Sequence, residues 1–273
     1  MRVTFLAITA LSAIGVAMPF QTARAQETAI VAPIEYVAPS VEDLTLLRKA
    51  VAAVQKRPIT ITSDIKVKAS GSGVLMTINE TVKVSGVFPD RFRADVTLLD
   101  EDGKTAAARF QVIADGKTVT TFRPGTKQYA TQTVGAFHKD FAMPVIGVVC
   151  GLIASGDPWL NEDMPIDTDT VAVFLDALKS TGMILESGAG VGGQRVFLMR
   201  SATTDTNGFR VVMTTDPVTE GFTAMEMSGK QGDWKFAITE TVRSMAKLPS
   251  FAAPVFDPPA DAKKVAKLSI WPF

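Results

Sequence analysis

The strongest pattern in the chain begins at residue 89 with the run Pro89-Asp90-Arg91-Phe92-Arg93-Ala94-Asp95-Val96-Thr97-Leu98. Its apolar side chains alternate with polar ones, which is typical of an antiparallel strand with one buried face. After turns at 102–103 and 115–117, two more strands are predicted, one over 109–113 and one that ends near 128–131. A sheet with one apolar face must be covered by another layer. What covers it is therefore the main question about function.

The segments before this run predict a helix and a hairpin. Ser40 and Asp43 have the spacing of a helix N-cap and an acidic first turn, and Pro58 should end the helix. Residues 59–67 and 74–84 then alternate on either side of a Ser/Gly turn, as the two strands of a hairpin do. Glu80 is the exception, because it is a charged residue in the apolar phase of the second strand.

Strand alternation is lost between residues 138 and 185. The run 144–154 is short and apolar, which favours a helix, and Asp169 is expected to cap another. Strands are expected again over 195–199, 209–213, 222–228 and 234–242, with a hairpin turn at Thr206-Asn207-Gly208. The Pro-rich segment 251–261 should be extended.

The N-terminal residues have the three-part layout of a secretory signal peptide. Arg2 supplies a positive charge, residues 3–20 are uncharged and mostly apolar, and Ala23-Arg24-Ala25 is an A-x-A cleavage site. Cleavage after Ala25 would leave 26 basic and 28 acidic residues, a net charge of about −2. We therefore expect a periplasmic protein. Its single cysteine, Cys150, excludes an intramolecular disulfide.

Composition excludes two classes of protein. A chain with nearly balanced charge has no basic stripe for nucleic acid. Outside the signal, the longest uncharged run is 141–156, and a membrane-spanning helix needs about 20 apolar residues. We therefore expect neither a nucleic-acid-binding protein nor an integral membrane protein.

The sequence predicts no catalytic site, metal or cofactor. His138 is the only histidine and lies in no hydrolase or metalloprotease motif. The acidic turn at 100–103 lacks the ligand set of a calcium loop, and the glycine-rich run 188–193 lacks the Lys-Ser/Thr of a phosphate loop. Cys150 lies among apolar residues, so its thiol is expected to be buried and inert.

Several short motifs resemble one known superfamily. They are Pro89-Asp90-Arg91-Phe92-Arg93, Asp115-Gly116-Lys117, Pro124 ahead of Gln128-Tyr129-Ala130-Thr131, and the ending Phe256-Asp257-Pro258-Pro259-Ala260-Asp261-Ala262-Lys263-Lys264-Val265. With the order of signal, helix and strand meander, they resemble the LolA/LolB-like superfamily, and within it the DUF2092 group. The resemblance implies an α+β fold. Its sheet is a strongly curved, unclosed antiparallel half-barrel, with helices packed on the concave apolar face as a lid.

Domain boundaries follow from the pattern and the resemblance. Residues 26–39 are expected to form a flexible leader and residues 40–265 one half-barrel domain. A helical insertion near 138–185 belongs to that domain, and residues 266–273 form a C-terminal tail.

The resemblance also implies a role for one arginine. In the family's lipoprotein carrier, an arginine at the position resembling Arg93 holds the lid, which here would mean hydrogen bonds to backbone carbonyls of residues 142–156. Alternation places Arg93 on the polar side of its strand if Phe92 faces inward. Either the strand is bulged, or Arg93 points inward and Phe92 packs outside.

The leading hypothesis is a non-enzymatic binding protein with an apolar cavity for acyl chains or lipidated ligands, and thus a possible lipid or lipoprotein carrier. Methionine suits a cavity that accepts guests of varying shape, but it suits an ordinary core equally well. The alternative is an envelope interaction or regulatory module whose core is filled and whose partner docks on an edge strand or on the tail. The residues expected to line the cavity are Phe92, Val96, Phe110, Val112, Met76, Ile78, Met213, Val211, Met225 and Phe236.

Overall fold

The computed structural model describes residues 34–55, 57–139, 143–154, 166–202, 208–231 and 233–270. The expected signal peptide, most of the expected leader and the turn residues Thr206-Asn207 lie outside these ranges. The last three residues of the expected tail also lie outside them.

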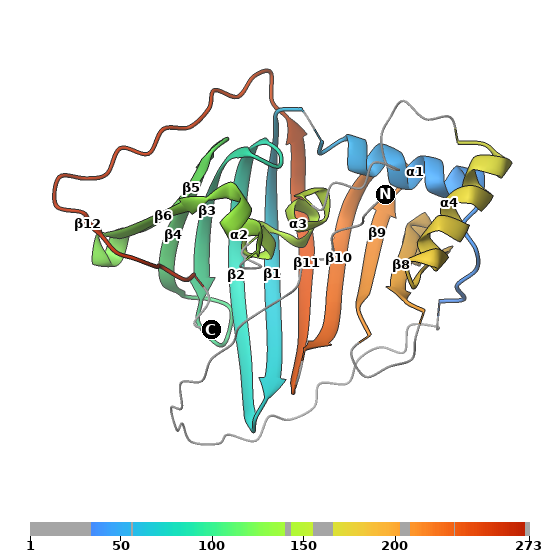
Figure 1. Cartoon of the computed structure of the whole chain (residues 1–273), viewed down its shortest axis with the longest axis horizontal. Helices are drawn as coiled ribbons and strands as arrows, with labels where there is room; N and C mark the ends of the chain where they lie inside the picture. The colour runs from blue at the N-terminus through green and yellow to red at the C-terminus, as the bar shows by residue number, and fades with distance from the viewer. Residues whose placement is uncertain are drawn as a thin grey trace.

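The described chain forms a single sheet with the strand order β12-β6-β5-β4-β3-β2-β1-β11-β10-β9-β8-β7 (Figure 1). Neighbouring strands are antiparallel, except that β12 runs parallel to β6. β7 and β12 stand at opposite ends of this order, so the sheet is unclosed. The strands are β1 (Ile59–Gly71), β2 (Val74–Val87), β3 (Arg91–Leu99), β4 (Ala106–Asp115), β5 (Thr118–Arg123), β6 (Gln128–Thr133), β7 (Met183–Ala189), β8 (Arg195–Ser201), β9 (Arg210–Asp216), β10 (Gly221–Gln231), β11 (Trp234–Lys247) and β12 (Lys263–Lys264).

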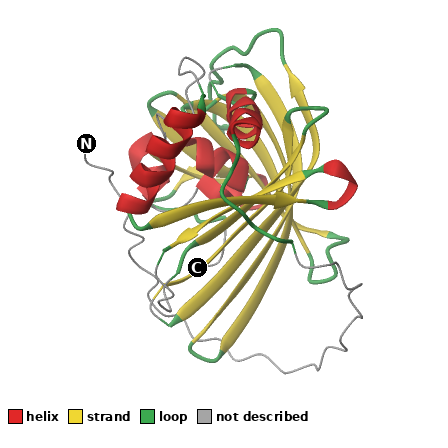
Figure 2. Ribbon diagram, turned by 90° about the vertical axis from the view of Figure 1, so that its right-hand side faces the viewer, coloured by secondary structure: helices red, strands yellow, loops and turns green. Residues whose placement is uncertain are grey.

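The helices gather on one side of the curved sheet (Figure 2). They are α1 (Val41–Ala52), α2 (Val134–Lys139), α3 (Val148–Ala154) and α4 (Thr168–Ser180), with a short 3-10 turn, η2 (Met143–Ile146), before α3. α1 contacts β9 and β10, α2 contacts β5 and β6, α3 contacts β10 and β11, and α4 contacts β7. The expected fold class is therefore confirmed: an α+β protein with a large unclosed, mostly antiparallel sheet and few helices.

Helix α1 begins as its sequence predicts. The Ser40 hydroxyl accepts a hydrogen bond from the Asp43 amide at 3.1 Å, and the Asp43 carboxylate accepts one from the Ser40 amide at 3.0 Å. This reciprocal pair is a capping box, which satisfies two backbone donors that a helix start leaves unpaired. Leu44, Leu47 and Val51 then pack into the core.

Three sequence expectations need correction. Residues 183–189 form the edge strand β7, although their glycines and weak alternation did not predict a strand. α4 is capped by Asp167 and not by Asp169, because the Asp167 side chain accepts the Thr170 amide. The segment after Asp115 forms two strands, β5 and β6, separated by a 3-10 turn that starts at Pro124.

Both edges of the sheet are covered by segments from the two ends of the described chain. At one edge, Val37 and Ser187 of β7 exchange backbone hydrogen bonds of 2.9 and 2.8 Å. At the other, β12 pairs with β6, and the Phe256 ring packs between Phe122 and Tyr129 with centroid distances of 5.5 and 5.3 Å. An uncovered edge strand would offer unpaired backbone groups to other chains.

Candidate functional site

The apolar side chains expected to line a cavity lie on one face of the sheet. Directly opposed residues of an antiparallel ladder point to the same side. The register pairs Val96 with Phe110, Ala94 with Val112, Ala69 with Met76 and Phe236, Val67 with Ile78, Met225 with Met213, and Met227 with Val211. Phe92 lies two residues before Ala94, and its ring is 6.4 Å from that of Phe137 in α2. We call this helix-covered side the lid face.

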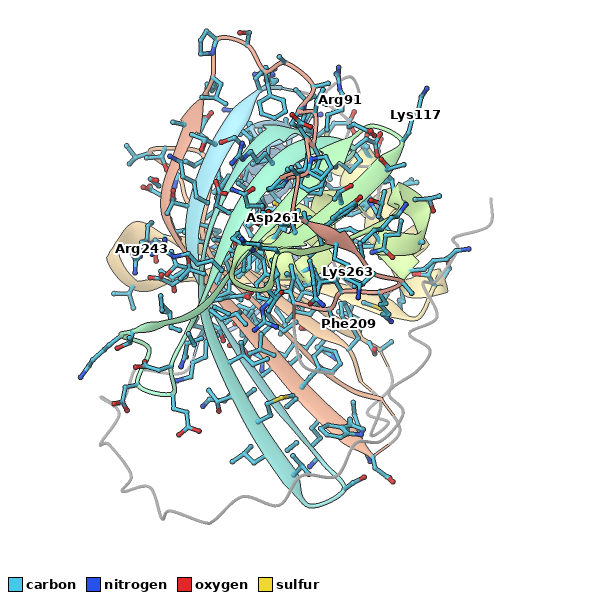
Figure 3. All side chains as sticks on the ribbon, turned by 90° about the vertical axis from the view of Figure 1, so that its left-hand side faces the viewer. Arg91, Lys117, Phe209, Arg243, Asp261 and Lys263 are labelled. Carbon is cyan, nitrogen blue, oxygen red and sulfur yellow. The ribbon has the colours of Figure 1, made fainter. Side chains whose placement is uncertain are left out.

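Burial divides the lid face into two parts. Eight of the ten expected residues are buried in one hydrophobic cluster, which also contains Val148, Val149 and Cys150 of α3. Met76 and Phe236 pack against this cluster but are only partly buried. Both lie in the ladder close to the turns that end the β1–β2 and β10–β11 hairpins. These turns are far from the helices (Figure 1), and Phe209 lies on the same lower part of the sheet (Figure 3).

Two glutamates interrupt the apolar lid face at its centre. In the register, Ile65 of β1 is opposed by Glu80 on one side and by Glu240 on the other. Neighbouring strands are about 4.8 Å apart, so the two glutamate backbones are roughly 10 Å apart. Both glutamates are 1% exposed. Buried carboxylates are uncommon unless they are hydrogen-bonded, so this row is the most unusual feature of the face.

Glu240 holds the start of α3 against the sheet. One of its oxygens accepts the Ser63 hydroxyl at 2.6 Å, and the other accepts the Val149 amide at 2.9 Å. Burial raises the pKa of Glu240, and the hydrogen bonds from Ser63, Val149 and Val148 only partly oppose this effect. The donors that face Glu240 are thus neutral groups. We call Ser63, Glu240 and the two amides the Glu240 latch.

Gly147 makes the latch possible. It precedes α3 with φ of 126°, a conformation that residues with a side chain rarely adopt. A Cβ atom at this position would lie 2.9 Å from Oε1 of Glu240, which is closer than an ordinary contact. The chain therefore needs glycine here, both for its turn and for the close approach of the carboxylate.

Burial is the main cause of the shifted pKa values of two other groups of the lid, Cys150 and His138. Burial raises the pKa of the Cys150 thiol well above its usual value, and the nearby Glu240 carboxylate raises it further. The expectation that Cys150 is buried is confirmed, and its thiol is free. Burial lowers the pKa of His138 in α2, while Asp90 partly opposes this shift.

Arg93 does not occupy the position that the resemblance implied. Its strand is not bulged at this point: Phe92 is fully buried on the lid face, and Arg93 is on the other face with half of its side chain exposed. Its ion-pair partner is Asp95, at 3.7 Å. The sheet thus separates Arg93 from α3, and the side chain that holds α3 is Glu240.

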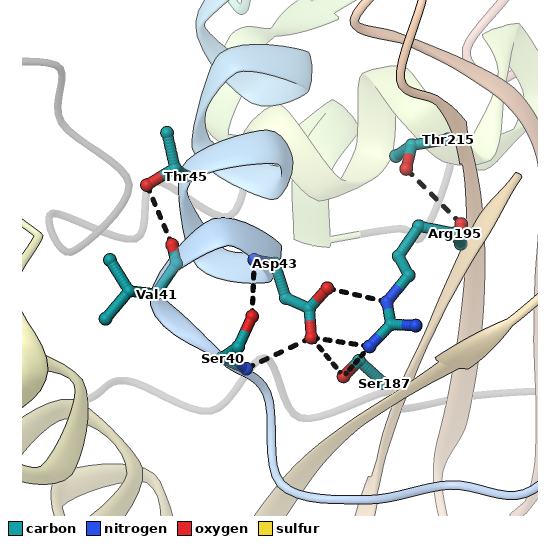
Figure 4. A network of polar contacts seen from close by, with 7 residues as sticks. All are labelled: Ser40, Val41, Asp43, Thr45, Ser187, Arg195 and Thr215. Carbon is teal, nitrogen blue, oxygen red and sulfur yellow. Dashed lines mark hydrogen bonds and ion pairs between the residues drawn. The ribbon is translucent and has the colours of Figure 1, made fainter.

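Another buried carboxylate, that of Asp43, ties α1 to the β7–β8 end of the sheet. Asp43 accepts Ser187 of β7 at 2.7 Å and is bidentate with Arg195 of β8, at 2.6 and 2.7 Å (Figure 4). Burial alone would raise the pKa of Asp43. Hydrogen bonds from Arg195, Ser40 and Ser187, and the charge of Arg195, outweigh burial, so the pKa lies below its ordinary value.

Sequence reasoning missed Glu240, Ser63 and Gly147. The available signal was an acidic residue in the apolar phase of a strand, which stands out at Glu80 but also occurs in the run Phe236, Ile238, Glu240, Val242. That signal marks an unusual position, but it does not name the partner, because Ser63 and Val149 are distant in sequence.

Neither a metal cluster nor a membrane span is found in the part of the chain that the structure describes. These ranges contain no group of three or more His, Cys, Asp or Glu side chains that could hold a metal ion. Among the same residues, no helix combines the length and the apolar character that crossing a bilayer demands.

No family model matches the chain, and no curated protein matches it. Several solved structures are similar at low sequence identity. An uncharacterized conserved protein from Thermus thermophilus is 11% identical with a TM-score of 0.40, over 82% of this chain and 98% of that one. LprF from Mycobacterium bovis is 10% identical with a TM-score of 0.36, over 80% and 99%. A LolA superfamily protein from Nitrosomonas europaea is 11% identical with a TM-score of 0.37, over 76% and 94%.

Proposed function

We propose that this protein is a non-enzymatic periplasmic binding protein that holds an acyl chain, or a similar amphiphile, on the lid face. In this proposal α3 is a movable cover. We also propose that the chain belongs to the DUF2092 group, on the basis of the sequence motifs quoted above. The observation that carries the proposal is the Glu240 latch. A cover that closes a permanent core needs no carboxylate at its contact, since apolar residues of similar size would be as stable or more stable there.

Burial against the apolar lid face would supply enough free energy to bind a chain-shaped ligand. Burial of a methylene group contributes about 0.8 kcal/mol, so a chain of a dozen carbons contributes roughly 10 kcal/mol before the costs of association. The ligand would replace the apolar contacts that Val148, Val149 and Cys150 make in the closed state. Its free energy would therefore compensate for opening the cover.

Uptake of a fluorescent fatty acid, together with native mass spectrometry of the purified protein, tests the proposal. We expect saturable uptake and a bound mass. Phe236→Ala should weaken uptake about fivefold to tenfold, because this ring lies at the partly buried end of the lid face. Val218→Ala, at a residue 89% exposed in the β9–β10 turn, should leave uptake unchanged. A protein that takes up no fatty acid and carries no bound mass contradicts the proposal.

Cys150 provides a second test, of the movement itself. It is the only cysteine of the chain and is buried in α3, so a thiol reagent modifies it only when the cover opens. We expect modification to be slow in the free protein and faster by about tenfold with a saturating fatty acid. A rate that a bound fatty acid leaves unchanged argues against displacement of α3.

A second candidate function is an interaction module, and the course of the C-terminal segment favours it. β12 occupies the edge of β6, and Phe256 packs on Phe122 and Tyr129, so an envelope partner could bind here by displacing the segment. Deletion of residues 251–273 followed by affinity capture tests this role. Loss of a captured partner with unchanged fatty-acid uptake would favour the interaction module over the carrier.

A further inference from the structure

The ends of the β1–β2 and β10–β11 hairpins carry apolar side chains where most water-soluble sheets carry polar ones. Leu75 is 77% exposed and Val74 is 51% exposed, and both follow the turn between β1 and β2. Met76, Trp234 and Phe236 lie beside them in the ladder. We call Val74, Leu75, Met76, Trp234 and Phe236 the hairpin tip. The helices of the described chain lie across the other part of the sheet (Figures 1 and 3).

Two glycines support the aromatic rings of the hairpin tip. A Cβ atom on Gly71 would lie 2.6 Å from the Trp234 ring, and one on Gly229 would lie 3.0 Å from the Phe236 ring. Each ring therefore lies directly over a glycine of a neighbouring strand. This arrangement fixes the rings on the lid-face side of the tip, while Leu75 shares the opposite side with Ser70 and Lys235.

The charges around the hairpin tip are mainly positive. Ser70, at the end of β1, lies between Leu75 and Lys235, and Lys235 is opposed by Lys230. Lys68 follows along the same face of β1 and is exposed, whereas Lys66 lies farther from the tip, opposite Asn79. The acidic residues nearby are Asp233 in the turn and Glu226 on β10.

A second acidic group lies farther from the tip. The turn that contains Asp100, Glu101 and Asp102 is attached to Asn79, whose side chain donates to the carbonyls of Asp100 and Glu101. Asn79 is four residues from Leu75, or about 13 Å along the strand. That distance exceeds the Debye length of about 8 Å at physiological ionic strength, so these carboxylates weaken the positive field at the tip only slightly.

We propose that the hairpin tip docks onto the surface of an anionic lipid bilayer. Val74 and Leu75 would enter the boundary between headgroups and acyl chains, Trp234 would lie at the headgroup level, and the lysines would face lipid phosphates. Apolar side chains beside lysines and a tryptophan are the combination that interfacial binding requires.

Docking by this tip would bring the partly buried end of the lid face to the membrane. Met76 and Phe236 belong both to the tip and to the partly buried end of that face. An acyl chain would then pass between bilayer and protein without crossing water. This step goes beyond the proposed ligand binding, yet docking itself can be measured without any ligand, so either proposal can fail alone.

Co-sedimentation with vesicles tests the inference. We expect the full chain to bind vesicles of phosphatidylcholine mixed with phosphatidylglycerol, to bind phosphatidylcholine alone more weakly, and to dissociate as salt is raised. The double variant Val74→Ser/Leu75→Ser should bind the anionic vesicles at least about tenfold more weakly, and Lys68→Glu/Lys235→Glu should lose the preference for the anionic lipid. Val218→Ser is the matched control, since Val218 is 89% exposed in a different turn.

Three results would overturn the inference. The first is a parent protein that stays in the supernatant with anionic vesicles. The second is an equal loss of binding in Val218→Ser and in the double variant. The third is a parent dimer that the double variant converts to monomer in sedimentation equilibrium, because the tip would then be an interface between two copies. Bromine-labelled lipid should also quench tryptophan fluorescence of the parent more than that of Trp234→Phe.

Discussion

Two buried carboxylates, Asp43 and Glu240, each tie a helix to the same sheet, but in different ways. Asp43 binds a cation, Arg195, through two oxygens and also caps its own helix. Glu240 accepts a hydroxyl and amide groups, all of them neutral. As a result, the pKa of Asp43 lies below its ordinary value, and the pKa of Glu240 lies above it.

This difference shows that burial alone does not fix what a carboxylate does. A carboxylate that is paired with a guanidinium favours the charged, closed state at neutral pH. One that meets only neutral donors in an apolar layer is destabilised as an anion, so the helix above it is held less firmly as pH rises. We therefore regard α1 as a fixed element and α3 as the element that can be released.

The largest expected effect is at Asp43, which holds the fixed helix α1. Asp43→Ala leaves Arg195 and Ser187 without their acceptor and removes the capping box of α1. We expect a loss of about 3 kcal/mol in the free energy of unfolding, measured by urea denaturation, because a buried pair is costly to break.

Glu220→Ala is the control for Asp43→Ala, since Glu220 pairs with Lys49 of the same helix and both side chains are about half exposed. An exposed pair contributes less than about 1 kcal/mol, so this variant should stay close to the parent. Similar losses in the two variants would contradict the special role of the buried pair.

The second prediction disturbs the latch through the backbone. Gly147→Ala places a Cβ atom against the Glu240 carboxylate and strains a residue with positive φ, so we expect a loss of about 2 kcal/mol. Modification of Cys150 should become faster at the same time. Gly151→Ala, in α3, is the matched control, because its Cβ would make only ordinary contacts with Pro144 of η2. This variant should stabilise the protein by up to about 1 kcal/mol.

The third prediction uses the opposite pKa shifts. Glu240 binds its proton more tightly in the folded state than in the unfolded state. Its contribution to the free energy of unfolding is therefore complete below its ordinary pKa of 4.5 and is lost as pH rises through the raised folded pKa. Asp43 has a lowered pKa, so its contribution is present above 3.8 and is lost as pH falls through the lowered folded value.

We therefore expect the parent to lose stability above pH 4.5, and Glu240→Gln to remove this loss. The loss of stability at acid pH that Asp43 causes should remain in the variant. At neutral pH we expect a change on the order of 1 kcal/mol or less, the size of one net hydrogen bond. Urea denaturation of parent and variant across this pH range measures the difference. A variant whose stability falls above pH 4.5 as steeply as that of the parent would show that another group titrates.

The smallest expected effect is at Arg93. Its exposed pair with Asp95 should contribute less than about 0.5 kcal/mol, so Arg93→Ala should leave stability and the modification rate of Cys150 unchanged. Faster modification of Cys150 in this variant would restore the role in holding the lid that the resemblance implied.

Much of the fold could be predicted from local patterns. Alternation along residues 59–67, 74–84 and 91–98 predicted β1, β2 and β3, and the pair Ser40 and Asp43 predicted the start of α1. The same alternation placed Phe92, Val96, Phe110 and Val112 on one face. β7 was not predicted, because an edge strand with glycines and a bridge to Val37 carries little alternation of its own.

The candidate site was predictable only in its apolar part. The sequence by itself determined a one-sided apolar sheet, an interrupting helical segment and the position of Glu80 within an apolar phase. Only the tertiary structure decided that Glu240 lies opposite Ile65, that Ser63 and the Val149 amide bind it, and that Arg93 lies behind the sheet. The physical reason is that side-chain periodicity is a property of one strand. The partner of a buried polar group depends on strand register and on which helix covers the face.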